Sequence, residues 1–127
     1  MEFEHFALNV TNPTTIANWY VENLAMKIVF EQKEKPFMTF LADKTGRVVV
    51  ELYNNSAAKV PNYQQKHHLE FHFAFKTENA EELKNKLLSK KCVLVEEVKP
   101  NDGSHLVMLR DPWGLALQLC QRATSLV

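Results

Sequence analysis

Apolar and polar residues alternate along several short runs of this chain, a pattern that predicts strands with one buried face. In the run 3–10, Phe6 and Leu8 share one face while His5 and Ala7 share the other. A four-residue Asp-Lys-Thr-Gly segment and an Asp-Pro-Trp-Gly segment both suit tight turns between strands. The same pattern predicts further strands at residues 26–32, 36–43, 47–53, 69–76, 92–98, 105–110 and 115–122.

Two segments instead show the helical spacing of apolar residues. After Asn12 and Pro13, a helix is predicted whose apolar stripe holds Ile16, Trp19, Tyr20 and Leu24. Asparagine is a good residue to cap a helix N-terminus, and proline suits the first helical position. A second helix is predicted at about 79–90, where a glutamate three residues after an asparagine resembles a capping box.

The order of these elements occurs twice because the chain nearly repeats itself. His-Phe-Ala-Leu at residues 5–8 returns as His-Phe-Ala-Phe at residues 72–75, and the offset, 72 − 5 = 67, holds without a gap through the first helix. A repeated segment indicates two copies of one supersecondary unit. We therefore predict an α+β fold with two β-α-β-β-β modules, at about 3–55 and 68–122, joined by a linker at about 56–67 in a single domain. Matching residues then face each other across an approximate two-fold axis.

Composition narrows the class of protein. The chain has 127 residues, 46% hydrophobic and 24% charged, with 15 basic and 15 acidic side chains. A neutral chain without a basic cluster argues against nucleic-acid or membrane partners. The two cysteines do not suggest a disulfide framework, and the acidic N-terminus does not resemble a secretory signal. We expect a cytoplasmic location.

Four polar residues are expected to converge between the modules. Alternation in the fourth and last predicted strands directs valines and leucines toward the helices, so Glu51 and Gln118 point the opposite way. His5 and His72 alternate with helix-facing phenylalanines and point to that same side. Two imidazoles and a carboxylate are good ligands for a divalent transition metal such as Zn, Ni, Fe, Mn or Co, and an amide oxygen can complete the set weakly.

The chain resembles the vicinal-oxygen-chelate superfamily, the glyoxalase, bleomycin-resistance and extradiol-dioxygenase group. Residues 5–8, 50–52, 72–75 and 110–118 carry the resemblance, which covers residues 3–122. It implies paired modules whose curved sheets form a cleft around a metal, usually in a homodimer. The family's metal positions match His5, Glu51, His72 and Gln118, supplied by one chain or by two chains with two ligands each.

Two residues depart from the family's pattern. The last metal position usually carries glutamate in the metalloenzymes, where glyoxalase I uses it for proton transfer, and it carries Gln118 here. Relatives that use glutathione often have arginine at the position of Asn9 to hold a substrate carboxylate. True glyoxalase I activity is therefore not expected. Glu51 can substitute as a base, so Glu51 and Gln118 are the candidate catalytic residues.

The resemblance implies a metal-dependent enzyme that binds two adjacent oxygens of a small substrate, of the lyase, isomerase or dioxygenase type. The alternative is a metal-free small-molecule binding or sequestering protein of the bleomycin-resistance type, in which His5 and His72 are ordinary buried histidines. His68 fits either the cleft mouth or a solvated loop, and His105 fits either a pocket wall or the core. The helix lysines Lys84, Lys86, Lys90 and Lys91 are expected on a solvated face, and Cys120 as a small buried residue.

Overall fold

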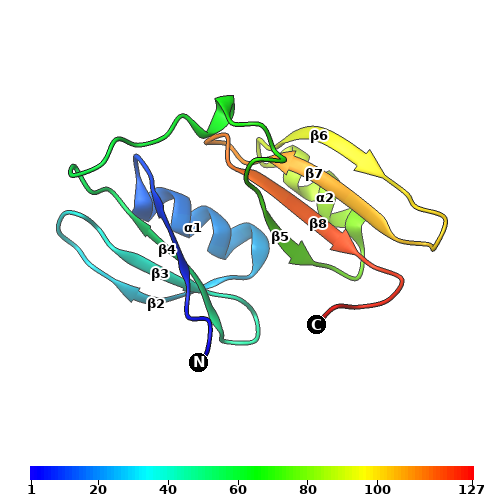
Figure 1. Cartoon of the computed structure of the whole chain (residues 1–127), viewed down its shortest axis with the longest axis horizontal. Coiled ribbons are helices and arrows are strands. Elements are labelled where there is room, and N and C mark those ends of the chain that lie inside the picture. Colours follow the sequence, from blue (N-terminus) through cyan, green and yellow to red (C-terminus); the bar gives the residue numbers. More distant parts are fainter. The chain divides into compact units, whose positions relative to one another are not determined.

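The computed structural model describes residues 1–127, which divide into two compact units, unit 1 (Met1–Pro61) and unit 2 (Asn62–Val127) (Figure 1). Each unit holds a four-stranded mixed sheet and one α-helix, which confirms the predicted α+β class. That both modules belong to a single domain stays a prediction.

Unit 1 has the predicted β-α-β-β-β order. Its strands are arranged β1-β4-β3-β2 in the sheet, with β1 parallel to β4 and the other two pairs antiparallel. The elements are β1 (Phe6–Asn9), α1 (Pro13–Leu24), β2 (Lys27–Glu31), β3 (Thr39–Ala42) and β4 (Val48–Tyr53).

Unit 2 repeats this topology as β5-β8-β7-β6, again with its outer pair β5 and β8 parallel. A short 3-10 turn, η1 (Tyr63–Gln65), comes first, within the predicted linker. The other elements are β5 (Phe73–Lys76), α2 (Ala80–Ser89), β6 (Val93–Val98), β7 (His105–Arg110) and β8 (Ala116–Gln121).

The two sheets also repeat in register. Ala7 lies opposite Glu51 between β1 and β4, and Ala74 lies opposite Gln118 between β5 and β8. The pairs β2–β3 and β6–β7 each carry an irregularity of register, and β3–β4 carries one that β7–β8 does not repeat. The strands are shorter than predicted, because β1 and β5 begin one residue after His5 and His72. Each histidine therefore precedes its strand rather than lying within it.

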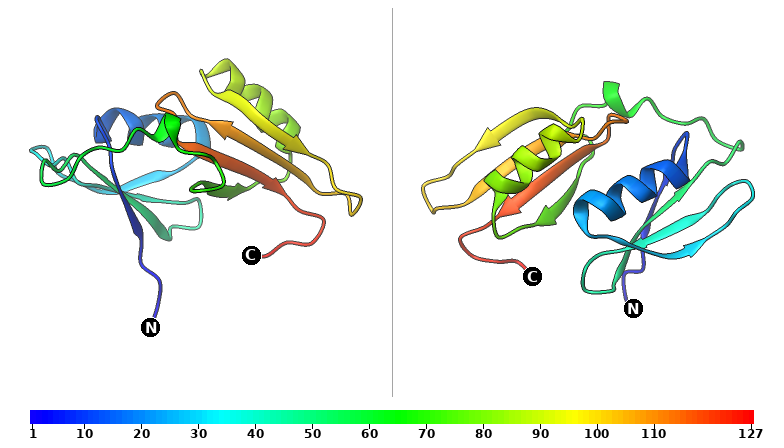
Figure 2. Two further views of the ribbon diagram at one scale, coloured as in Figure 1. Left: turned by 45° about the horizontal axis from the view of Figure 1, so that its top comes forward. Right: turned by 180° about the vertical axis from the view of Figure 1, so that it is seen from behind.

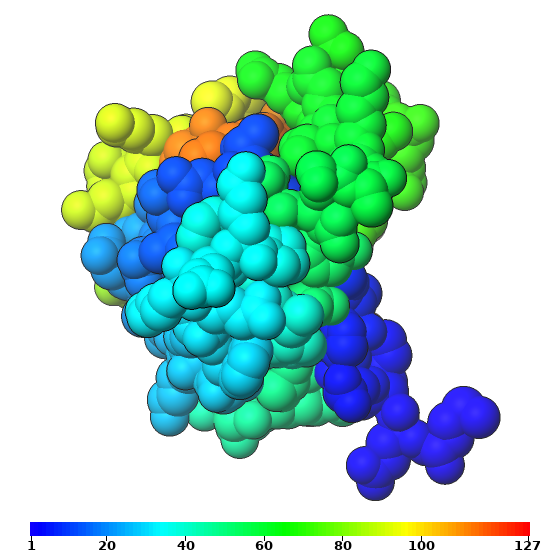
Figure 3. Space-filling model, turned by 90° about the vertical axis from the view of Figure 1, so that its left-hand side faces the viewer, coloured from blue at the N-terminus to red at the C-terminus, as the bar shows by residue number.

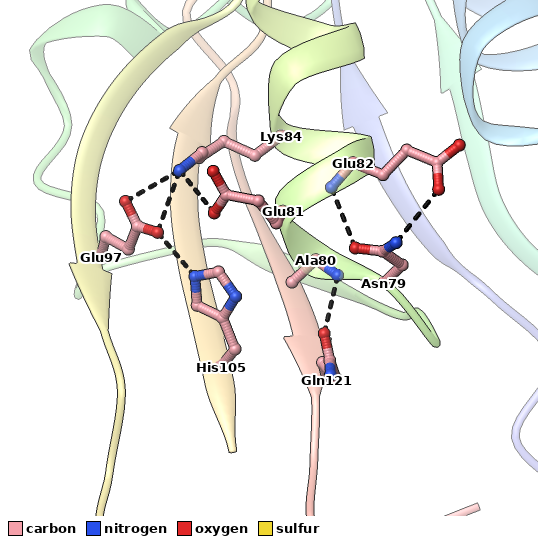
Figure 4. Close-up of polar contacts among 8 residues, drawn as sticks. All are labelled: Asn79, Ala80, Glu81, Glu82, Lys84, Glu97, His105 and Gln121. Atoms are coloured by element: carbon pink, nitrogen blue, oxygen red, sulfur yellow. Dashed lines mark hydrogen bonds and ion pairs between the residues drawn. The ribbon is translucent and has the colours of Figure 1, made fainter. Parts of the chain in front are cut away.

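Both helices begin at the asparagines that the sequence indicates. The side-chain oxygen of Asn12 accepts a hydrogen bond from the backbone N–H of Thr15 at 3.2 Å. The side-chain oxygen of Asn79 accepts one from the N–H of Glu82 at 3.0 Å, and its amide donates to the Glu82 carboxylate at 3.1 Å (Figure 4). These bonds satisfy N–H groups that the first helical turn leaves without partners.

Each helix covers one face of its own sheet (Figure 2). In unit 1, Ile16 and Tyr20 of the predicted stripe are buried, whereas Trp19 and Leu24 are only half-buried. In unit 2 the fully buried leucines lie on α2, β7 and β8. We call the sheet face opposite the helix the open face of each unit.

The first residues of unit 1 are exposed and extend away from its sheet (Figure 3). Neither helix of the chain combines the length and the apolar character that a bilayer crossing needs.

Candidate functional site

Two of the predicted ligands lie together in unit 1. Glu51 sits in the middle of β4, where its neighbours Val50 and Leu52 are buried on the helix side, so its carboxylate lies on the open face. The Nε2 atom of His5 lies 3.2 Å from the Oε2 atom of Glu51. Their side chains are only 25% and 12% exposed, and the ring of Phe40 packs edge-on against the imidazole of His5 at 5.1 Å.

The second ring nitrogen of His5 fixes the imidazole's tautomer. Nδ1 lies 2.7 Å from the carboxylate oxygen Oε1 of Glu4. An ionised carboxylate only accepts hydrogen bonds, so Nδ1 is the donor, and a ring with a single proton then has its lone pair on Nε2. That lone pair faces Glu51, and two acceptors at 3.2 Å repel each other unless a proton or a cation lies between them. The spacing suits two ligand atoms of one divalent ion, with bonds of about 2.1 Å.

His72 in unit 2 has the same arrangement. Its Nδ1 atom lies 2.8 Å from the backbone carbonyl oxygen of His68, which also can only accept. Nδ1 is therefore the donor, and Nε2 of the neutral ring holds the lone pair. Histidines that bind metals commonly donate their other ring N–H to a carboxylate or a carbonyl, which orients the ring. Both predicted ligand histidines are held in this way.

The segment that supplies the carbonyl of His68 is fastened by the motif that carries the family resemblance. The guanidinium of Arg110 donates to the backbone oxygens of Tyr63, Lys66 and Gly114 at 3.2, 2.8 and 2.9 Å. Gly114 has a φ of +89°, and a Cβ atom there would approach Gln64 to 2.7 Å. Glycine is therefore required by both the backbone angle and the space.

Gln118 lies on the open face of unit 2, in the register position that Glu51 holds in unit 1. Its amide oxygen accepts a hydrogen bond from the Cys120 thiol at 3.3 Å. Burial raises the pKa of the Cys120 thiol, and burial raises the pKa of the Cys92 thiol to about 12. Both sulfurs therefore stay protonated near neutral pH, as expected for packing residues rather than nucleophiles.

Asn9, at the position where some relatives place arginine, has a structural role. Its amide donates to the carbonyl oxygens of Asn55 and Ala58 at 3.0 and 2.9 Å, and its oxygen accepts from the N–H of Asn55 at 2.8 Å. These three bonds fasten the segment after β4 to the end of β1. Asn9 is thereby occupied by its own chain.

A second polar cluster lies between α2 and its sheet (Figure 4). Glu81, Glu97 and His105 offer ligand atoms within 4.8 Å of one another and could hold a metal ion. The ammonium group of Lys84, however, lies 2.9 Å from Glu81 and 3.0 Å from Glu97, and His105 Nε2 lies 2.6 Å from Glu97. The Lys84 ammonium thus already supplies a cation to both carboxylates.

The ionisation of this cluster agrees with internal pairing. The hydrogen bonds of His105 and then of Lys84 lower the pKa of Glu97, and the hydrogen bond of Lys84 lowers the pKa of Glu81. The two glutamates in turn raise the pKa of Lys84. Each partner favours the charged form of the other.

The structure corrects one sequence-based expectation here, for Lys84, and bears on the alternatives stated for His105 and His68. Lys84 was expected on a solvated face, but its side chain is only 11% exposed. His105 is 8% exposed on the helix side of β7, away from the open face. The repeat held a signal for Lys84, because the offset of 67 matches it to Ala17, a fully buried residue of α1. His68 is likewise not a solvated loop residue: its Nε2 atom lies 3.4 Å from Glu96 and its side chain is 14% exposed.

Comparisons with known proteins agree with this architecture. A glyoxalase-family protein from Bacillus cereus has a TM-score of 0.77 at 11% identity, over 94% of this chain and 93% of that one. A glyoxalase-family protein from Enterococcus faecalis has a TM-score of 0.68 at 25% identity, over 94% and 97%. An antibiotic-binding protein from Streptomyces sp. CB03234 has a TM-score of 0.70 at 15% identity, over 95% of both chains. No curated protein sequence matches.

The sequence model of one family matches nearly the whole chain, over residues 2–119. That match is consistent with the duplicated units, which share a parallel strand pair at one edge and the same register. The chain belongs to the glyoxalase/bleomycin resistance protein/dioxygenase superfamily.

Proposed function

We propose that the protein is a metal-dependent enzyme that acts on a small oxygenated substrate, with His5, Glu51 and His72 as metal ligands. The observation that carries the proposal is the matched state of the two histidines. Each places Nδ1 against an acceptor, at 2.7 Å in unit 1 and 2.8 Å in unit 2, so that a ring with a single proton has its Nε2 lone pair available for a ligand. This arrangement is the one that metal-binding histidines commonly show.

Gln118 is proposed as a weak ligand or as a hydrogen-bond donor to the substrate. Its oxygen already accepts the Cys120 thiol proton, which leaves the amide N–H groups to donate. An amide cannot take up a proton near neutral pH, so any base must come from elsewhere, and Glu51 is the carboxylate on the open face of unit 1. The metal, when bound, would act as a Lewis acid that stabilises negative charge on the substrate's oxygens.

The protein's own residues would orient and hold these groups. Glu4 and the His68 carbonyl fix the two imidazoles, and Phe40 packs against the ring of His5 and limits its contact with water. A homodimer and a cytoplasmic location belong to the same proposal, the latter supported by two buried free cysteines.

Metal analysis tests the proposal. Protein purified without an affinity tag or chelator is expected to hold about one transition-metal ion per complete ligand set, and His5→Ala and His72→Ala are each expected to lose it. His67→Ala is the matched control: Nδ1 of His67 accepts from the backbone N–H of Leu69 at 3.1 Å, so its Nε2 carries the proton and has no lone pair. Equal metal content in all four proteins contradicts the proposal.

The competing function is metal-free binding of an organic molecule. An antibiotic-binding protein has a similar structure, which is why this function is the second candidate. At 15% identity that similarity supports the fold alone. Metal-free protein that binds organic ligands equally well before and after His5→Ala would favour this alternative.

A further inference from the structure

Unit 2 contains a pocket of about 450 Å³ beside the open-face position of Gln118. Its walls come from residues 74–78 at the end of β5, residues 120–123 at the end of β8, and residues 125–127. Figure 1 shows the segment after β8 turning back toward the end of β5. The volume lies in the range of small-molecule sites, which is about 300–1,000 Å³.

Two cationic side chains, Lys76 and Arg122, line this pocket. Lys76 lies opposite Cys120 in the parallel pair β5–β8, and Arg122 follows two residues beyond Cys120. The ammonium of Lys76 donates one hydrogen bond, at 2.8 Å, to the main-chain oxygen of Val127. An ammonium has three donors, so donors remain for a ligand.

One side-chain carboxylate lines the pocket, against two cationic side chains. Glu78 lines the pocket itself. The pKa of Asp102 is lowered first by hydrogen bonds from Ser104 and then by the nearby charge of Arg122. Asp102 therefore offsets part of the charge of Arg122. Lys76 is therefore the principal cation for a ligand, with Arg122 in support.

In unit 1 the position that matches Lys76 carries no cation. There Asn9 takes the place of Lys76, opposite Tyr53, and its amide is bonded to the segment after β4. The cation of Lys76 is thus a feature of unit 2 that the matching position of unit 1 does not repeat. Lys76 lies two residues beyond Ala74 on β5, and Ala74 lies opposite Gln118. Two residues of a strand span about 7 Å along the backbone.

We propose that Lys76 and Arg122 form a subsite for the anionic group, carboxylate or phosphate, of a small substrate whose other end reaches Gln118. This inference rests on the proposed function, because it assumes that the substrate binds at the open face. The substrate class is then an oxygenated small molecule that also carries a negatively charged group.

Nuclear magnetic resonance titration tests the subsite with the full chain, as purified and after chelation. The probes are butyrate, butyl phosphate and the neutral control butanol. Saturable shifts at residues 74–78 and 120–126 are expected with at least one anion and not with butanol, and the tighter anion identifies the group. In Lys76→Met the dissociation constant should rise about tenfold.

Lys99→Met is the control, since Lys99 is an exposed lysine of unit 2 that does not line the pocket. It should bind the anion as the unchanged protein does, and Arg122→Gln gives a second reading that does not depend on Lys76. Equal affinity for butanol and the anions, or no loss in either pocket variant, overturns the inference. Because the chelated protein is also measured, failure of the subsite and failure of metal binding are separate results.

Discussion

Glu51 in unit 1 and Gln118 in unit 2 hold the same register position, each opposite an alanine of the neighbouring parallel strand. Around them the backbone of the two units has the same strand order and the same parallel pair at one edge of the sheet. The side chains around the two positions differ. Unit 1 places a carboxylate beside its histidine at 3.2 Å, whereas unit 2 places an amide bonded to a thiol. The duplicated backbone thus supplies two equivalent positions, and the side chains give each one a different chemistry.

The helix sides of the two sheets differ as well. Ala17 of α1 is completely buried, and the matching Lys84 of α2 brings a charge to the same place. Glu97 on β6 and Glu81 on α2 compensate for that charge. A charged group near the core is costly unless it is paired, and these two carboxylates supply that pairing for Lys84.

The core should show the largest effect and the smallest difference between units. Leu52 and Leu119 are matched leucines that are 2% and 0% exposed. Either Leu→Ala change should lower the free energy of unfolding by about 2–5 kcal/mol, because a cavity remains. Urea unfolding measures both. A loss below about 1 kcal/mol at one site only would show that the two cores are not equivalent.

The turn glycines should separate the units more clearly. Gly46 and Gly114 both have a φ of +89°, yet a Cβ atom at Gly46 meets nothing within 4 Å, whereas one at Gly114 approaches Gln64 to 2.7 Å. Gly46→Ala should cost about 1 kcal/mol from backbone strain, and Gly114→Ala about 2–4 kcal/mol. Thermal unfolding compares them. Equal losses would mean that the segment at Gln64 moves away freely.

Gln118→Glu should make the two open faces alike. A second carboxylate adds a strong ligand to the proposed set, so the metal dissociation constant should fall by about tenfold. Competition with a metal indicator of known affinity measures the change. Gln121→Glu, on the same strand but bonded to the start of α2, is the control and should leave metal affinity unchanged. Unchanged affinity in Gln118→Glu would place residue 118 outside the metal's reach.

The cluster beneath α2 should give the smallest effect, and one that depends on pH. Lys84→Met removes the cation between Glu81 and Glu97 and should destabilise the protein at neutral pH. Because the pKa of Glu97 is lowered in the fold, its stabilising contribution is present above its ordinary value of 4.5 and is lost as the pH falls through the lowered value. Urea unfolding of both proteins at pH 7 and pH 3 should therefore show a difference that shrinks in acid. A difference that grows in acid contradicts this pairing.

Much of the fold follows from the sequence because the repeat and the alternation are local signals. The helix caps at Asn12 and Asn79, the order of elements and the register of Gln118 were all predictable from short patterns. The boundaries of β1 and β5 were not, since alternation continues beyond the last ladder hydrogen bond.

The site was less predictable than the fold. The alternation of apolar and polar residues placed Glu51 on the open face. The Nδ1 bonds of His5 and His72 depend instead on Glu4 and on the carbonyl of His68, in the segment that Arg110 holds. The role of Lys84 depends on partners from another strand. These contacts depend on side-chain and backbone geometry even where the partners are close in sequence, and no periodicity reports them.

The protonation state of the imidazoles tests the central claim most directly. Long-range proton–nitrogen correlation spectra of the metal-free protein, at about pH 8 where ordinary histidines are neutral, report which ring nitrogen holds the proton. We expect His5 and His72 to carry it on Nδ1, His67 to carry it on Nε2, and added Zn²⁺ to shift Nε2 of His5 and His72 alone. Protons on Nε2 of His5 and His72, with no response to Zn²⁺, would contradict the proposed metal site.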